Sequence, residues 1–398
     1  MQQIDEKTTP RHFALFERGF RPFFSAAGLF AVTGMLLWML IYVFSVPLTL
    51  SGLAPVAWHA HEMIYGYAMA VVAGFLLTAV VNWTGIPTLH GSGLVVLLGL
   101  WILARVAWFL PLDFSLQLAA AADLLFLLGL IAAVSLPVLR ARQWKQLGIL
   151  SKLWLILAAD GLFHAGATGY PDQGIRWGLY TGLYLVLALV FVMARRVLPF
   201  FIERGVDEDF APRNRAWLDS ASLVLFLVWA LMDVYTRQTA LIAWLSLGLF
   251  GLHAGRLFDW HTPGIWKKPL LWSLYLGYAF LSFGFLLKAL SIWHGLSPYL
   301  ALHAFAVGGI GLMTIGMMSR VALGHTGRNV FDPPGILLPV FSLLVLAALA
   351  RVVIPLVDPV RYTLWIGTSQ VFWMLGFAVF SIVYVPQLIR PRVDGHPG

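Results

Sequence analysis

Long apolar segments follow one another along almost the whole chain, separated by short polar stretches. Each segment is about 20 residues long, the length that an α-helix needs to cross the hydrocarbon core of a bilayer. We therefore expect an all-α fold, a polytopic transmembrane helical bundle of about twelve spans. The predicted spans cover residues 22–45, 60–82, 92–111, 116–139, 151–169, 177–202, 217–236, 239–256, 270–290, 299–320, 333–356 and 362–388.

The polar stretches between these spans are too short to form a separate soluble domain. The longest runs from Glu203 to Arg215. We expect one transmembrane domain over residues 1–398, with a short N-terminal segment at 1–21 and a tail at 389–398. The first apolar run begins near Pro22 and is longer than the apolar core of a secretory signal, so a cleavable signal peptide is not expected.

Basic residues are concentrated in the loops that follow the even-numbered spans, and the N-terminal segment is basic as well. Because loops rich in Lys and Arg stay in the cytoplasm, this bias predicts that both termini are cytoplasmic. The formal net charge is +8, but only 11% of the residues are charged and no Lys/Arg-rich arm is present. We read the basic charge as a topology signal and expect the lipid bilayer, not nucleic acid, as the partner.

The chain contains no cysteine. This excludes disulfides, iron–sulfur clusters, thiolate copper sites and covalently attached c-type haem. Any haem would be bound non-covalently, as a b-type haem, and any metal would be held by His, Met, carboxylate or Tyr side chains.

Two histidines and a carboxylate, His59, His61 and Glu62, lie where the second span begins. Ionisable side chains are costly inside a membrane and usually have a function and a partner there. Histidine is the commonest side-chain metal ligand, so this segment is a candidate metal or haem site. Residues two apart on a helix face different directions, so both histidines can bind one metal only if the helix begins near His61. Otherwise one is a ligand and the other a neighbour, or the pair only caps the helix.

Other histidines fall into two groups by depth. His303 begins the tenth span at the same predicted outer level as His61, and it precedes a glycine-rich helix that could admit a macrocycle or simply pack closely. His164 lies in the outer part of the fifth span, one turn after Asp160, which could orient it or only satisfy it. On the cytoplasmic side, His253 and His325 are weaker metal-ligand candidates.

The sequence has two further features: a predicted buried charge pair and a weak internal similarity between two spans. Arg105 and Asp123 lie at similar distances from their shared outer loop, which predicts an ion pair, although Arg105 could instead neutralise a haem propionate. Trp83-Thr84-Gly85 begins 22 residues after His61, and His325-Thr326-Gly327 begins 22 residues after His303. This similarity suggests a degenerate repeat that relates the second and tenth spans.

Four spaced motifs resemble the NnrS family over nearly the full chain. The sequence departs from the expected pattern at Val81, where a proline is expected, and at Phe305-Ala306, and neither change removes a candidate ligand. The motifs are Phe20-Arg21-Pro22-Phe23-Phe24, Trp58-His59-Ala60-His61-Glu62-Met63, Asn82-Trp83-Thr84-Gly85 and Leu323-Gly324-His325-Thr326-Gly327-Arg328.

The resemblance implies a bacterial cytoplasmic-membrane protein with twelve helices that contains haem and copper and is linked to denitrification and defence against nitric oxide. Haem ligands are then expected at His61 and His303, with His59, His164 and Arg105 as further cofactor-binding candidates. The metal candidates are His59, His61, His303, His253 and His325. Nitric oxide is the expected small-molecule partner, and the sequence does not identify an electron donor.

The resemblance leaves three functions open. The chain could act on nitric oxide as a haem-dependent oxidoreductase, or sense it, or limit nitrosative damage. A secondary transporter with Asp160, Arg105 and Asp123 along its path is an alternative, and a cofactor-free assembly factor is another. Against transport, the sequence contains no convincing inverted repeat, and the intramembrane charges can pair with one another.

Overall fold

The computed structural model describes residues 13–236 and 238–395, and within these ranges the chain is entirely helical. Eleven continuous helical segments are long and apolar enough to cross a membrane. They are Phe20–Tyr42 (α1), Pro55–Thr84 (α2, η1 and α3), Ser115–Arg140 (α5), Trp144–Ala167 (η2 and α6), Gly174–Gly205 (α7), Ala216–Tyr235 (α8), Thr239–Trp260 (α9), Pro269–Trp293 (α10), Pro298–His325 (α11, η4 and α12), Leu337–Val357 (α13, η5 and α14) and Tyr362–Leu388 (α15).

The remaining predicted span, the third, corresponds to the short apolar helix α4, Ser92–Ala107. It ends four residues before the predicted limit of 111, because Trp108 to Leu110 form a turn that leads into Pro111. The polytopic helical fold predicted from the sequence is thus confirmed, with each predicted span matched by a helix. The predicted N-terminal segment and tail are described only in part, because residues 1–12 and 396–398 lie outside the described residues.

Besides η5 (Leu349–Val353) in the eleventh span, two of the described spans contain a π-helical segment at corresponding places. In the second, α2 (Pro55–His61) passes into the π-helix η1 (Glu62–Ala68) before α3 (Met69–Thr84). In the tenth, α11 (Pro298–His303) passes into the π-helix η4 (Ala304–Gly311) before α12 (Leu312–His325). Both spans start with proline, whose fixed φ suits the first turn of a helix. π-Helical segments often occur at functional sites, and each of these directly follows a histidine.

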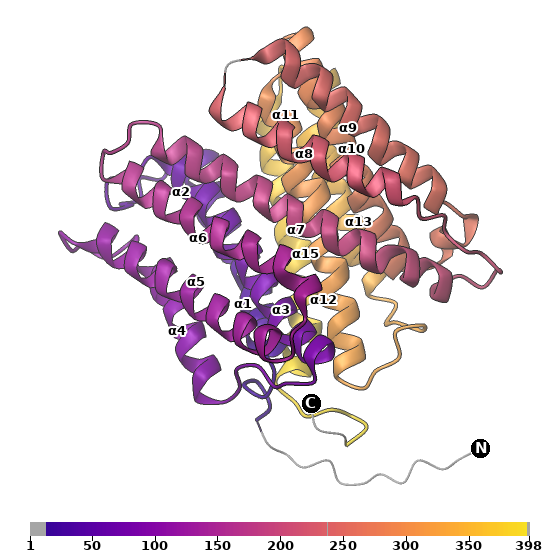
Figure 1. Cartoon of the computed structure of the whole chain (residues 1–398). Coiled ribbons are helices and arrows are strands. Elements are labelled where there is room, and N and C mark those ends of the chain that lie inside the picture. Colours follow the sequence, from indigo (N-terminus) through magenta and orange to yellow (C-terminus); the bar gives the residue numbers. More distant parts are fainter. Residues whose placement is uncertain (1–12, 237, 396–398) are drawn as a thin grey trace.

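The N-terminal and C-terminal halves of the bundle lie side by side, with α1 packed against α15 (Figure 1). Helices α6 and α7 form one antiparallel pair, and α9 and α10 form another. The core is rich in aromatic rings, and small residues allow close approach: a Cβ on Gly74 would come within 2.7 Å of the Phe24 ring. The large apolar side chains that remain exposed, such as Leu227 and Ile382, are expected of helices that face lipid.

Backbone and side-chain contacts join the beginning and the end of the described chain. The Ala14 amide donates to the Ile389 carbonyl at 3.0 Å. The buried Arg21 guanidinium donates to the carbonyls of Leu388 at 2.8 Å and Arg390 at 2.6 Å. Both described ends therefore lie at the same end of the bundle, as an even number of spans requires (Figure 1). We call the opposite end, where α2 and α11 begin, the distal end.

Candidate metal centre

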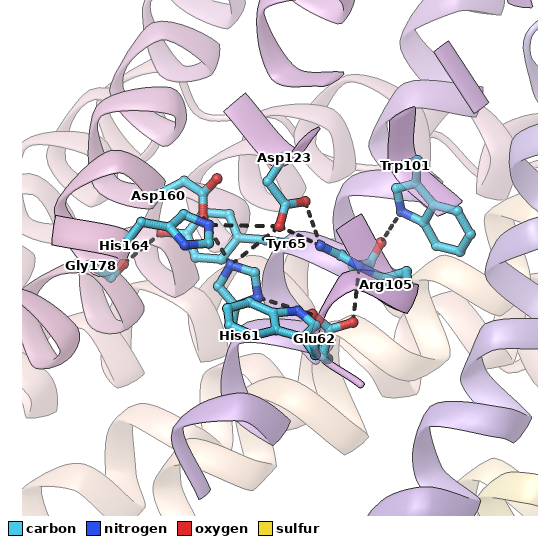
Figure 2. A network of polar contacts seen from close by, with 11 residues as sticks. His61, Glu62, Tyr65, Trp101, Arg105, Asp123, Asp160, His164 and Gly178 are labelled. Carbon is cyan, nitrogen blue, oxygen red and sulfur yellow. Dashed lines mark hydrogen bonds and ion pairs between the residues drawn. The ribbon is translucent and has the colours of Figure 1, made fainter. Parts of the chain in front are cut away.

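Three helices bring four potential metal ligands together near the distal end (Figure 2). His61 is the last residue of α2, and Asp123 lies in α5. Asp160 and His164 lie in α6, where their spacing of four residues places both on one helix face. All four are buried, with exposed fractions between 0% and 4%. We call this set, His61, Asp123, Asp160 and His164, the four-ligand cluster.

The four ligand atoms form a compact set around a common centre. His61 Nε2 lies 3.0 Å from Asp160 Oδ1 and 3.8 Å from Asp123 Oδ2. His164 Nε2 lies 3.6 Å from the same Asp160 oxygen and 3.7 Å from the same Asp123 oxygen. Ligand atoms about 2 Å from one ion are necessarily about 3–4 Å apart, so these separations suit one metal ion bound by two nitrogens and two oxygens.

Several polar atoms of the cluster lack a hydrogen-bond partner within the described residues. Both ring nitrogens of His164 and the Oδ2 atom of Asp160 are buried without one. Unpartnered buried polar atoms are uncommon in folded proteins, and a bound ion is one way to satisfy them. Of these atoms, His164 Nε2 is the one that faces the carboxylate oxygens of the cluster, so its lack of a hydrogen-bond partner fits a bound metal.

The charge balance of the region points the same way. Three buried carboxylates, Glu62, Asp123 and Asp160, lie near a single fixed cation, Arg105. Burying an uncompensated charge is strongly unfavourable, so this arrangement requires additional positive charge. A divalent cation would supply it. Protonation of both imidazoles would supply the same charge without a metal, and the metal content of the purified protein separates the two states.

A second layer of residues holds the ligands in place. Glu62 Oε1 lies 3.1 Å from His61 Nδ1 and accepts a hydrogen bond from Trp108 Nε1 at 2.9 Å. Arg105 pairs with the Asp123 carboxylate and lies 3.0 Å from Glu62 Oε2. With Nδ1–H donated to Glu62, the Nε2 atom of His61 is free to bind an ion; such carboxylate partners orient metal-bound histidines in many proteins.

Aromatic rings close the space around the four-ligand cluster. The His61 ring stacks on Phe163 at 4.3 Å between centroids, and the His164 ring lies parallel to Trp108 at 5.8 Å. Tyr65, whose ring centroid is 4.9 Å from that of His61, donates to the Gly178 carbonyl at 2.7 Å. A Cβ on Gly182 would collide with the Tyr65 hydroxyl, so a glycine in α7 allows this approach.

These residues fit a metal ion but not a haem that His61 and His303 share. Two axial histidines must direct nitrogens at one iron from opposite sides. Here the Nε2 atom of His61 lies among the carboxylates, whereas that of His303 receives a hydrogen bond from Arg351 at 3.3 Å. No hydrogen bond, ion pair or ring contact joins the two histidines in the described part of the chain. The prediction that this pair holds one haem therefore has no support in the geometry.

The other predicted site residues lie in different surroundings. His59 points away from His61 and stacks on Trp38 at 4.4 Å between centroids. Its helix begins at Pro55, not near His61 as a shared metal would require, so the two residues face different directions. His253 contacts the Tyr278 hydroxyl at 2.7 Å, and His325 packs on Phe20 with ring centroids 5.5 Å apart.

The structure brings together some predicted residues and adds two potential metal ligands, Asp123 and Asp160. His61, His164 and Arg105 meet, and the predicted ion pair of Arg105 with Asp123 is present. The sequence indicates Asp123 and Asp160 only as partners of nearby side chains, not as metal ligands. The sequence did contain a sign of this role, because a carboxylate within an apolar span is costly and marks a functional position.

Fold and centre together define a class: a polytopic helical membrane protein with a buried His/Asp cluster that can hold a metal ion. Within that class, residues 14–392 match the family described as NnrS protein, and the chain belongs to the NnrS family. The match covers nearly the full chain and confirms the resemblance carried by the sequence motifs. A search among curated proteins found no match.

Proposed function

We propose that this chain is a copper-binding protein of the bacterial cytoplasmic membrane that acts in nitric oxide metabolism or in resistance to nitrosative stress. One observation carries the proposal: four buried ligand atoms from three helices lie within 4.8 Å of one another. Membership of the NnrS family supplies the nitric oxide context.

The donor set favours a transition metal. Imidazole nitrogens suit copper, zinc, iron and nickel, whereas magnesium and calcium prefer oxygen ligands alone. Two imidazoles and two carboxylates thus suit copper well, and copper is the metal that the family resemblance implies. When bound, copper supplies one-electron redox chemistry.

The chain's own residues have distinct roles in this proposal. His61 and His164 bind the ion through Nε2, and Asp123 and Asp160 bind it through one carboxylate oxygen each. Glu62 fixes the tautomer of His61, and Arg105 holds Asp123 in place. Phe163 and Trp108 exclude water from the centre. Nitric oxide is small and uncharged, so it can reach a centre buried among helices through the lipid phase.

Haem remains part of the proposal through the family resemblance alone. The visible spectrum of the detergent-purified protein tests it, because bound haem gives an intense Soret band. We expect that band after haem-replete expression. A protein that carries copper and no Soret band would remove haem from the account and leave the metal centre in place.

Growth under nitric oxide tests the function. Cells that lack this protein should grow worse under nitric oxide than under a comparable dose of an unrelated oxidant. Wild-type protein and the His294→Ala variant should restore growth, because His294 is exposed in a distal loop away from the four-ligand cluster. The His164→Ala variant, which removes one ligand, should not restore it.

Metal content and expression level must be measured in the same cells. Rescue by a His164→Ala protein that has lost its metal would refute a metal-dependent function and favour the transporter or assembly alternatives. Rescue by a His164→Ala protein that keeps its metal would show that His164 is not a required ligand. If His164→Ala fails to restore growth because it is poorly expressed, His164→Gln replaces it in the test, since glutamine keeps the side chain polar and of similar size.

A further inference from the structure

The C-terminal helices repeat the arrangement of the N-terminal helices. Helix α1 packs against the span containing η1, and α10 packs in the same way against the span containing η4. Each of these pairs is followed by two further packed spans, α4 with α5 and α13–α14 with α15. Eight spans precede α10, so both sets run through the bundle in the same direction. The fold therefore contains a parallel internal repeat.

Sequence landmarks support the repeat at several points. Arg21-Pro22 begins α1, and Lys268-Pro269 begins α10. The short distal loops end in Gly52-Leu53-Ala54-Pro55 and in Gly295-Leu296-Ser297-Pro298. The sequence similarity between the second and tenth spans therefore also includes the helices that precede them.

Packing supports the repeat as well. Gly74 and Gly316 each lie 13 residues after the histidine that ends the first segment of its span. A Cβ on Gly74 would come within 2.7 Å of Phe24 in α1. A Cβ on Gly316 would come within 2.9 Å of Leu274 in α10. Corresponding glycines thus allow corresponding helices to approach.

The repeat places one buried arginine in each half, but their surroundings differ in charge. Arg105 near the end of α4 corresponds to Arg351 near the end of the α13–α14 span. The first repeat supplies Glu62 and Asp123 as partners for its arginine. The second has Ala304 directly after its histidine, where the first has Glu62. It also has Gln370 eight residues into α15, where α5 has Asp123. Both carboxylates are replaced by uncharged residues.

Arg351 is buried, with 8% of its surface exposed, and has only neutral partners in the described ranges. It donates to the Tyr362 hydroxyl at 3.0 Å and to His303 Nε2 at 3.3 Å. The acidic residue nearest to it in the sequence, Asp358, contacts Trp365 and Arg361 instead. A guanidinium has five N–H donors, and a buried one without a carboxylate is costly unless an anion accompanies it.

Two of the histidines outside the four-ligand cluster, His303 and His59, lie near this arginine. His303 accepts its hydrogen bond, and His59, His303 and Arg351 interact electrostatically with one another. The Nδ1 atom of His59 is buried without a hydrogen-bond partner, while the ring is held by stacking on Trp38. An unsatisfied imidazole nitrogen beside an uncompensated guanidinium provides donors for a single negatively charged group.

We propose that Arg351 and His59 form a binding site for a small oxyanion at the distal end, separate from the four-ligand cluster. His303 holds Arg351 in place, because its Nδ1–H donates to the Tyr299 carbonyl at 2.7 Å and its Nε2 accepts from Arg351 at 3.3 Å. The planar fork of Arg351 suits two oxygens of one group, as in a nitrite, a carboxylate or a phosphate. A free anion and the phosphate of an anionic lipid share this chemistry. The proposal does not depend on the metal or on nitric oxide.

Calorimetric titration of the full-length protein tests the proposal. Wild-type protein in a neutral detergent and a low-chloride buffer is titrated with nitrite, acetate and inorganic phosphate. At least one of these should bind saturably. Arg351→Gln should weaken the binding by roughly 10-fold or more, the loss expected when hydrogen bonds to a charged group are removed. Arg361→Gln, an exposed change at the same end of the bundle, should leave the affinity unchanged.

Two further experiments, a second Arg351 variant and a change of lipid, remove the remaining ambiguities of the titration. Arg351→Lys keeps the charge but loses the fork, so it should also weaken binding of a planar oxyanion, and it serves where Arg351→Gln fails to fold. Nanodiscs that contain phosphatidylglycerol show whether the natural ligand is a lipid phosphate or a free anion. If acetate or nitrite no longer binds in these nanodiscs, the lipid phosphate occupies the site. If binding is retained, the site takes a free anion. The absence of saturable binding by wild-type protein, or equal binding by the Arg351 variants, would overturn the proposal.

Discussion

Single residues decide whether the buried charges near the distal end are stable. Arg105 pairs with Asp123 and lies 3.0 Å from Glu62, and all three side chains are buried. A buried ion pair adds little stability over a well-packed apolar pair, because both charges must leave water. Removing one partner is costly, since the other charge then remains buried alone. Arg105 is therefore important because two carboxylates depend on it.

The Arg105→Gln variant tests this dependence. It should destabilise the protein by about 3–5 kcal/mol, the usual cost of breaking a buried pair. The double variant Arg105→Gln/Asp123→Asn removes both charges and should recover part of that loss. Unfolding in detergent, followed by tryptophan fluorescence, measures both, with Arg361→Gln as the control. A double variant that is no more stable than Arg105→Gln alone would contradict the pairing.

Individual side chains also limit what the sequence could predict. His61, His164 and Arg105 could be selected because polar groups within apolar spans are rare. The roles of Asp123 and Asp160 depend on which faces of α5 and α6 meet α2, and helix packing in a bundle decides this, not local sequence. For the same reason the matching depth of His61 and His303 did not indicate that they belong to separate clusters.

At the scale of the element, the π-helical segments set the direction of the histidines. In η1 and η4, the longer hydrogen-bond register adds a residue relative to a regular α-helix. The helices before and after each π-helical segment can then each turn their own packing face toward the neighbouring helices. Apolar periodicity predicted both spans well but did not reveal this change of register, because the segments are as hydrophobic as their surroundings.

Deleting one residue of η1 should therefore disrupt the metal centre. Removal of Met63 allows a regular α-helix to continue and turns His61 by roughly 100° relative to α3, the rotation per residue of an α-helix. We expect the variant to insert in the membrane but to lose its metal. Deleting Ala306 of η4 is the matched control, because it redirects His303 and leaves the four-ligand cluster intact. Metal retention after the Met63 deletion would show that η1 does not position His61.

At the scale of the whole molecule, the described ends of the chain meet at one end of the bundle, opposite the four-ligand cluster. Loop charge predicts that this end faces the cytoplasm. The number of spans and their approximate positions were predictable, since bilayer thickness fixes helix length. Their limits differ by several residues from the predicted ones, as in Pro55–Thr84, predicted as 60–82, and Pro298–His325, predicted as 299–320. The packing of the halves was not, because lipid-facing and protein-facing helix surfaces are equally apolar here.

Reporter fusions test the orientation. A reporter active only in the periplasm should be silent when fused after Gly398 and active when inserted after His294, in the distal loop before α11. A reporter active only in the cytoplasm should give the opposite pattern. Periplasmic activity at Gly398 would invert the topology and place the metal centre near the cytoplasmic face.

The metal-to-protein ratio of two paired variants tests the central claim most directly. Wild-type protein purified from copper-replete cells should carry about one copper ion per chain in the four-ligand cluster, as a single site of this kind predicts. The double variant His61→Ala/His164→Ala should carry almost none, whereas His59→Ala/His303→Ala should keep the full amount. Retention of metal by the first variant with loss by the second would contradict the account and move the centre to the other pair of histidines.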